Sequence, residues 1–247
     1  MKMDSDTAIG GPRGAFPETR HSAIVRIASG EPQERTRAWE TIVAAYWKPV
    51  YKYVRLRWRQ SNEDAKDTVQ AFFMRAMEKD YFLSFDPRRA SFRTFVRTCV
   101  DGFVATERKA ATAQKRAPAA PLLSLDFANA EPEMATLNVA DPNSLEEYFR
   151  REWIRSVFEL AVDRVRAHVP ELAFRAWELY DLTEESARPR YADIAAELDA
   201  PVTQVTNWLA AARREFRQAV LDHLHELTAS DAEFEAEAHA LLGTPIE

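Results

Sequence analysis

The 247-residue chain has little of several residue types on which other fold and function classes depend. Its single cysteine, Cys99, excludes an internal disulfide and a cysteine-rich zinc site. Only 6 glycines are present, while Ala, Leu, Glu and Arg are common, and this bias favours helices over a sandwich or barrel. No apolar run approaches the roughly 18 residues of a membrane span. The first twenty residues also lack the apolar stretch of a secretion signal, so we expect a cytoplasmic protein.

The sequence also lacks the motifs that mark common enzyme classes. It contains no glycine-rich phosphate loop, no HExxH and no GxSxG. His223 and His225 are a possible metal pair, but a spacing of two residues places them on different faces of a helix. We therefore expect no catalytic residues, no metal and no cofactor.

The net charge of −6 averages over a strongly polarised chain. Residues 46–116 carry 16 basic and 8 acidic side chains, whereas residues 221–247 carry 7 acidic and no basic ones. A basic block inside an acidic chain indicates a polyanionic partner for that block, with a solvated basic helix surface as the plain alternative.

Apolar residues recur at helical spacing in two regions that flank a segment rich in proline. We therefore predict an all-α fold with two small helical domains joined by an irregular linker, in which Leu122, Leu123, Leu125 and Phe127 allow partial docking. The predicted divisions are a disordered N-terminus at 1–18, a first domain at 19–116, a linker at 117–143, a second domain at 144–225 and an acidic extension at 226–247.

The second domain contains the pattern of a helix-turn-helix. A short helix face ends at Leu198, Asp199-Ala200-Pro201 forms a turn, and a longer helix with buried residues three and four apart follows. The leading residues of such a second helix enter the major groove, where Gln and Asn read adenine edges. The candidate DNA-binding residues here are Thr203, Gln204, Thr206, Asn207, Arg213, Arg214 and Arg217. An ordinary polar helix face is the alternative interpretation.

Three segments together resemble the extracytoplasmic-function class of bacterial RNA polymerase sigma factors. EDAKDTVQAFFMRAMEK is similar to the helix that grips the polymerase, and the segment from FDPRRASF to AQKR is similar to the part that meets the minus-ten element. RYADIAAELDAPVTQVTNWLAAARREF is similar to the region that reads the minus-thirty-five element. The resemblance covers roughly residues 20–225, with the three segments in the family's order.

The resemblance implies partners and roles. The partners would be core RNA polymerase, through its beta-prime clamp helices and beta flap, promoter DNA, and as a further candidate an anti-sigma factor or another regulator. Polymerase binding would fall to Asp64, Asp67, Gln70 and Phe73. Contact with the minus-ten region would fall to Arg93, Arg97, Arg108, Lys109, Lys115 and Arg116.

Besides a linker that is longer than in the simplest members, the chain departs from the family in three places. Asp101 stands where the family usually has Asn and would repel phosphate, and the second helix of the helix-turn-helix carries few basic residues at 206–211. The acidic extension is the third departure, with Phe234, Ala238, Leu241 and Leu242 at helical spacing. It is either a solvated, partly helical tail or a tail that folds back on the basic domain. A DNA-binding regulator independent of polymerase and a helical adaptor that binds only protein are the alternatives to a sigma factor.

Overall fold

The computed structural model contains only helices, turns and irregular segments in the part of the chain that it describes, so the expected all-helical class is confirmed there. None of the helices in these ranges combines the length and apolarity that crossing a membrane requires. The expected disordered segment at 1–18 lies outside the described residues. Those residues are 22–28, 31–111, 125, 127, 130 and 142–243.

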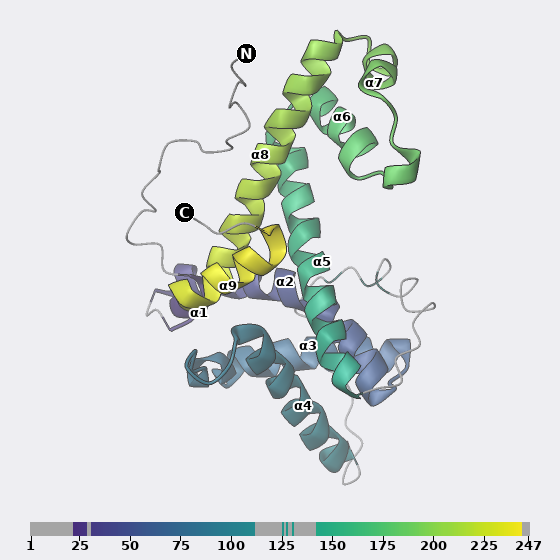
Figure 1. Ribbon diagram of the computed structural model, residues 1–247. Helices are drawn as coiled ribbons and strands as arrows, with labels where there is room; N and C mark the ends of the chain where they lie inside the picture. The colour runs from purple at the N-terminus through teal and green to yellow at the C-terminus, as the bar shows by residue number, and fades with distance from the viewer. Residues whose placement is uncertain are drawn as a thin grey trace.

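The helices form two groups along the chain, before and after the segment at 112–141 (Figure 1). The first group comprises α1 (Ala23–Arg26), α2 (Pro32–Trp58), α3 (Asn62–Glu78), the 3-10 turn η1 (Tyr81–Ser84) and α4 (Phe92–Ala111). The second comprises α5 (Pro142–His168), α6 (Glu171–Asp181), the 3-10 turn η3 (Glu185–Ala187), α7 (Tyr191–Glu197), α8 (Val202–Glu226) and α9 (Asp231–Leu242).

Local sequence explains where several helices begin and end. The Ser61 hydroxyl accepts the backbone N–H of Asp64 at 3.1 Å, and the Ser91 hydroxyl accepts that of Thr94 at 3.3 Å, so both serines cap the helices that follow. At the end of α7, Asp199 takes a left-handed conformation (φ 48°), and the Ala200 N–H bonds the Ala195 carbonyl at 2.9 Å. This six-residue closure ends α7 and turns the chain into α8.

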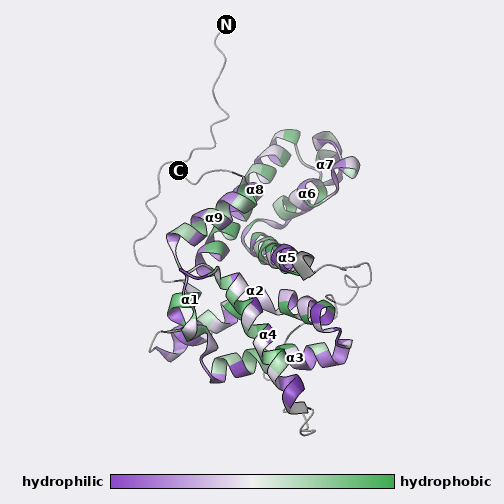
Figure 2. Ribbon diagram, turned by 60° about the horizontal axis from the view of Figure 1, so that its bottom comes forward, coloured by the Kyte–Doolittle hydropathy of each residue, from purple (hydrophilic) through white to green (hydrophobic). Residues whose placement is uncertain are grey.

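The buried apolar side chains form two clusters, and each helix carries its hydrophobic residues mainly on one side (Figure 2). The proximal core contains α1 to α4, the first half of α5, the end of α8 and α9. The distal core contains the end of α5, α6, α7 and the first half of α8, and its buried residues run from Val165 to Ala212. The expected boundary at residue 143 therefore does not separate the cores, because α5 and α8 run through both. Amphipathic spacing predicts which residues are buried and leaves open which cluster buries them.

Part of the linker docks on the proximal core, as expected. Phe127 is buried between Trp47 and Tyr51, with ring centroids 5.2 Å apart in both pairs, and Leu125 packs against the same core. Leu122 and Leu123 lie outside the described residues.

A buried ion pair joins α2 to α5 across the proximal core. The Lys52 ammonium lies 2.5 Å from the Glu152 carboxylate, and both side chains are almost fully buried. One turn along the same interface, Lys48 pairs with Glu159 at 2.7 Å in a more exposed position. The two pairs set the register of α5 on α2, and sequence reasoning missed both because their partners are about a hundred residues apart.

Candidate nucleic-acid interface

The helix-turn-helix is formed by α7, the turn at 198–201 and α8. Val205 and Leu209 of α8 are buried in the distal core, together with Ile194 of α7. This packing holds the start of α8 at the far end of the molecule from α9 (Figure 1). The geometry is that of a positioned second helix whose first turns face solvent.

The first turns of α8 carry polar side chains that are all exposed. Thr206 donates a hydrogen bond from Oγ1 to the Val202 carbonyl at 3.1 Å, which fixes its rotamer. The amides of Gln204 and Asn207 are available for recognition, because their helix face packs against none of the described elements. The structure therefore brings together the expected set of Thr203, Gln204, Thr206 and Asn207.

The three arginines further along α8 differ in how far they are engaged. Arg213 makes two hydrogen bonds to the Asp181 carboxylate, at 2.8 and 3.0 Å, and its guanidinium lies over the Tyr180 ring. Arg214 is exposed and Arg217 is half-buried. Arg214 is thus the best placed of the three to meet a phosphate, while Arg213 also ties α8 to the end of α6.

The first basic residues of α4 are not available for contact with DNA in this conformation, because other parts of the protein bind them. Arg93 pairs with Glu237 of α9 at 2.5 Å, and its guanidinium lies 5.0 Å from the centre of the Trp153 ring. Arg97 lies 3.5 Å from Asp101 and 3.8 Å from Glu146 of α5. The expectation of an open DNA-facing surface at these two residues is wrong for this conformation, because α5 and α9 pack over that side of α4.

Asp101 has a structural role at the edge of the proximal core that sequence reasoning missed. Its carboxylate accepts hydrogen bonds from the Tyr53 hydroxyl at 2.9 Å and from the Trp58 indole at 3.1 Å, and Arg97 balances its charge. A carboxylate with three internal partners presents little free charge to DNA, so the repulsion expected at this position is largely cancelled.

An accessible group of cations lies instead where α2 and α4 end. Trp58 is flanked by the guanidinium groups of Arg57 and Arg108, at 5.1 and 4.9 Å from its ring centre. Arg108 also donates to the Trp58 carbonyl, and Lys109 is exposed beside it. Arg59 caps α2 in a left-handed conformation and is exposed. We call Arg57, Trp58, Arg59, Arg108 and Lys109 the Trp58 edge.

Two residues of the Trp58 edge could have been found in the sequence. The run RLRWR at 55–59 combines basic and aromatic residues, which is typical of nucleic-acid contacts. Sequence reasoning selected Arg108 and Lys109 but missed Arg57 and Arg59, because a contact between the ends of two helices is a tertiary event. Lys115 and Arg116 lie outside the described residues.

The candidate polymerase-binding residues on α3 divide between surface and core. Asp67 is exposed and Gln70 half-buried, and both line a hollow of about 310 Å³ whose walls also include Met74 and Glu107. Asp64 is exposed, but its carboxylate accepts from the Ser61 hydroxyl at 2.7 Å and so also serves the start of the helix. Phe73 is fully buried against Phe72, which places it in the core and not on the expected surface.

Metal ligands and the single thiol are two groups of side chains that could react or bind. Among the described residues, no group of three or more His, Cys, Asp or Glu side chains is arranged to hold a metal ion. Burial raises the pKa of the Cys99 thiol to about 11, so this thiol is protonated at neutral pH and a poor nucleophile. What the surface offers is charge and hydrogen bonding.

No protein-family model matches the chain, and no curated protein matches it either.

Proposed function

We propose that the chain is a sigma factor of the extracytoplasmic-function class, which binds core RNA polymerase in the cytoplasm and directs it to particular promoters. One observation carries the proposal: α7 and α8 present Thr203, Gln204, Thr206 and Asn207 together on the exposed leading turns of a helix-turn-helix. A polar face on an ordinary bundle does not require this short-helix, turn and long-helix geometry.

The other surfaces support a division of labour. The acidic hollow with Asp67 and Gln70 offers hydrogen-bond acceptors to a basic partner, as the beta-prime clamp helices would be under the resemblance. The Trp58 edge offers cations to the DNA backbone, two of which pack against the Trp58 ring. These surfaces lie on α3 and at the joined ends of α2 and α4, so one domain would touch polymerase and promoter at once.

The proposed mechanism uses binding free energy and no catalysis by this chain. Polymerase contacts on α3 would recruit the protein, amide contacts from Gln204 and Asn207 would select the upstream element, and cations of the Trp58 edge would hold the backbone downstream. The polymerase would supply the chemistry of RNA synthesis. No cofactor is needed for any of these roles.

The test is transcription in vitro with cognate core polymerase and a library of genomic promoter fragments, together with co-elution of the protein and core. We expect a stable complex and transcripts from a limited set of fragments. The double variant Asp67→Ala/Gln70→Ala should weaken binding to core at least tenfold without changing which promoters are chosen, as loss of a buried charged contact predicts. Glu40→Ala, which removes an exposed carboxylate from α2, is the matched control and should leave binding unchanged.

The two alternative functions predict other outcomes. A regulator independent of polymerase binds a duplex site by itself, and Asp67→Ala/Gln70→Ala leaves its activity intact. An adaptor binds protein but gives no specific transcript and no salt-sensitive DNA binding. Absence of both co-elution and specific transcripts would overturn the sigma-factor proposal.

A further inference from the structure

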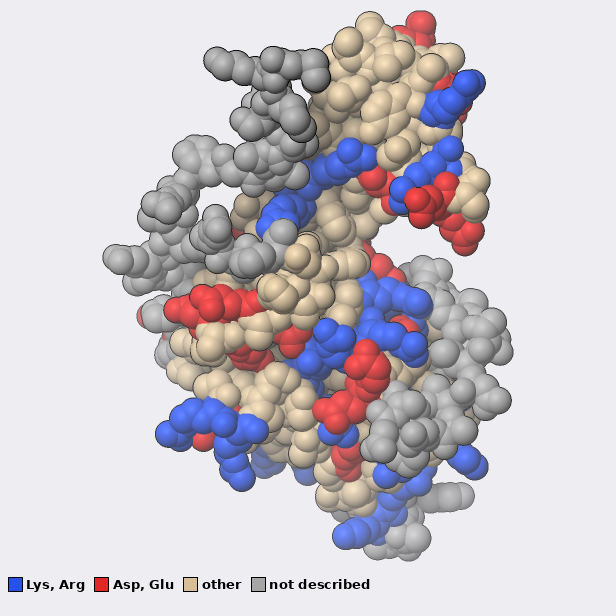
Figure 3. Space-filling model, viewed as in Figure 1, with Lys and Arg blue, Asp and Glu red and all other residues tan. Residues whose placement is uncertain are grey.

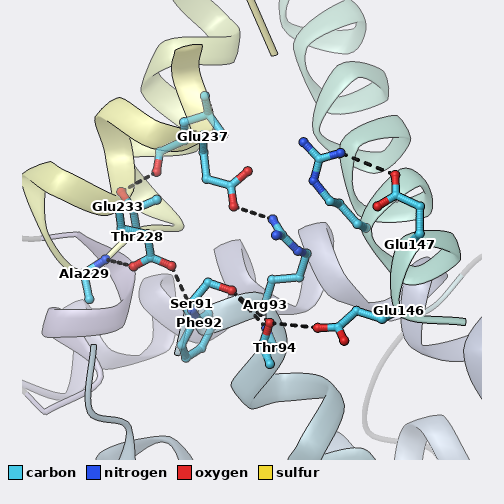
Figure 4. A network of polar contacts seen from close by, with 12 residues as sticks. Ser91, Phe92, Arg93, Thr94, Glu146, Glu147, Thr228, Ala229, Glu233 and Glu237 are labelled. Atoms are coloured by element: carbon cyan, nitrogen blue, oxygen red, sulfur yellow. Dashed lines mark hydrogen bonds and ion pairs between the residues drawn. The ribbon is translucent and has the colours of Figure 1, made fainter. Parts of the chain in front are cut away.

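The acidic extension forms a helix that docks on the start of α4 (Figure 4). Phe234 and Ala238 of α9 are buried in the proximal core, and Leu241 and Leu242 pack against it. Figure 3 shows acidic side chains on α9 with basic side chains on the neighbouring elements. Of the two possibilities that the sequence left open for this tail, the structure shows the folded-back one.

Two carboxylates of α9 bind the first turn of α4. Glu233 accepts the backbone N–H of Phe92 at 2.8 Å, which is one of the amides that the start of a helix leaves without an intrahelical partner. Its other oxygen accepts the Ala229 N–H at 3.1 Å, at the start of α9 itself. One turn along, Glu237 binds Arg93 at 2.5 Å, with both side chains largely buried.

The groups that α9 binds are those that commonly bind phosphate. A backbone amide at a helix N-terminus and a neighbouring guanidinium are complementary to an oxyanion that accepts a hydrogen bond from each, and both carboxylates and phosphates can do so. The remaining acidic residues of the helix, Asp231 and Glu235, are exposed, and the helical repeat places them on the side opposite Glu233 and Glu237. Two acidic residues of α9 therefore bind the start of α4, and the other two are exposed to solvent.

We propose that α9 is an exchangeable cover that competes with nucleic-acid phosphates for the start of α4, so that the free protein binds DNA weakly until α9 is displaced. The inference rests on the proposed function in one respect: it takes nucleic acid to be the ligand of α4. Core polymerase or promoter DNA would release the cover by offering stronger contacts to the same domain.

The size of α9 makes release feasible. The helix has 12 residues, a length at which an isolated helix is marginal in water, so its structure depends on docking. It is joined to α8 by the short segment Leu227–Ser230, and a short docked helix of this kind can open locally. Undocking would free Arg93 and, with movement of the start of α5, Arg97.

The experiment removes the two inward charges while keeping the shape of the helix. Glu233→Gln/Glu237→Gln keeps the packing of Phe234 and Ala238, whereas Asp231→Asn/Glu235→Gln, the matched control, changes the net charge equally on the outward side. Binding of a labelled duplex of mixed sequence is measured by fluorescence anisotropy at low and moderate salt. If about nine-tenths of the free protein is covered, the inward variant binds about tenfold more tightly, because apparent affinity scales with the competent fraction.

The control separates a specific cover from general repulsion. We expect the outward variant to gain less than about twofold in DNA affinity, since its carboxylates act only through screened, long-range charge. Equal gains from the two variants, or no gain from the inward variant, would overturn the proposal. Hydrogen exchange gives a second measurement: the amides of α9 and of the first turn of α4 should exchange faster in the inward variant only.

A reciprocal exchange keeps the test informative if the inward variant is unstable. Arg93→Glu/Glu237→Arg restores a pair of opposite charges, so it should recover slow hydrogen exchange in α9, while Arg93→Glu alone, which places a third carboxylate beside Glu233 and Glu237, should not. Hydrogen exchange is the readout for this pair of variants, because Arg93 is itself the proposed phosphate ligand. These readouts need no polymerase. If Glu233→Gln/Glu237→Gln gains DNA affinity but neither this variant nor the unchanged protein forms transcripts with core polymerase, the proposal for α9 stands and the sigma-factor proposal fails. If transcription is normal but the variant gains no DNA affinity, the sigma-factor proposal stands and the proposal for α9 fails.

Discussion

The start of α4 and the start of α8 carry candidate DNA-binding residues of very different availability. At the start of α4, Arg93 and Arg97 are engaged with carboxylates from α9 and α5. At the start of α8, the polar side chains face solvent and contribute almost nothing to packing. The comparison teaches that a basic residue in a DNA-binding sequence pattern can be part of the protein's own structure. It also predicts that substitutions near α4 change stability, whereas those at the start of α8 change only recognition.

The largest effect on stability should come from the buried Lys52–Glu152 pair, which holds α5 against α2 beside the start of α4. Lys52→Met leaves the buried Glu152 carboxylate with only the more distant, exposed Arg155 guanidinium, at 3.8 Å, and should lower the free energy of unfolding by about 3–5 kcal/mol. Lys48→Met, at the more exposed pair on the same interface, should cost less than about 1 kcal/mol.

Urea denaturation measures both variants. Lys52→Met/Glu152→Leu should recover most of the stability, because an apolar pair of similar volume removes the uncompensated charge. Equal losses for Lys52→Met and Lys48→Met would show that burial of the pair is not the cause.

The next prediction compares Arg97 of α4 with Arg214 of α8. Arg97→Ala should lower the free energy of unfolding by about 1–3 kcal/mol, because it leaves the partly buried Asp101 carboxylate without its cation. Arg214→Ala should change stability by less than about 0.5 kcal/mol and reduce the salt slope of DNA binding by about 1. Thermal unfolding and a salt series with the same duplex measure the two quantities. A loss of stability in Arg214→Ala larger than that in Arg97→Ala would reverse the comparison.

Recognition of the DNA base sequence should depend only on the exposed residues at the start of α8. Gln204→Ala or Asn207→Ala should reduce discrimination between a preferred duplex and a single-base variant by about 1–3 kcal/mol, with no loss of stability. Gln218→Ala, near the other end of α8, is the control and should leave discrimination unchanged. If Gln204→Ala weakens binding to all duplexes equally, α8 positions the protein without reading bases.

The smallest effect concerns pH and the end of α8 that joins the proximal core. Burial lowers the pKa of His223 below its usual range, with a further lowering from Arg164, against opposing effects of the Leu160 backbone and Asp222. The unfolded chain then binds more protons than the folded one as the pH falls through the usual value of 6.5, so stability decreases in that direction. His223→Gln should flatten this part of the stability profile, and His239→Gln, at an exposed site, should not.

Much of the local structure could be predicted from sequence. The turn at Asp199 and the apolar stripe of Phe234 and Ala238 were expected from short-range rules, and the structure confirms both. The caps at Ser61 and Ser91 are explained by rules of the same range. Of the candidate site, the exposed leading residues of α8 were predicted in full, because helix periodicity separates the buried positions from the outward ones.

The rest of the candidate site depended on contacts between distant segments. Phe73 is in the core because α3 packs through that side, and Arg57 joins Arg108 because two helix ends meet at Trp58. Periodicity identifies a face of a helix but not the element that covers it. For the same reason the helical spacing of the acidic extension could be predicted from sequence, but its docking on the start of α4 could not.

The sequence by itself determined that the described part of this protein is helical and that a short helix, a turn at Asp199 and a longer helix follow one another in its second half, because these features depend on residues only a few positions apart. The tertiary structure alone decided that α5 and α8 run through both cores, that Lys52 meets Glu152, and that Glu237 binds Arg93. The two ion pairs join residues 100 and 144 positions apart. Contacts at such separations follow from how whole helices pack, and they leave no periodic pattern in the chain.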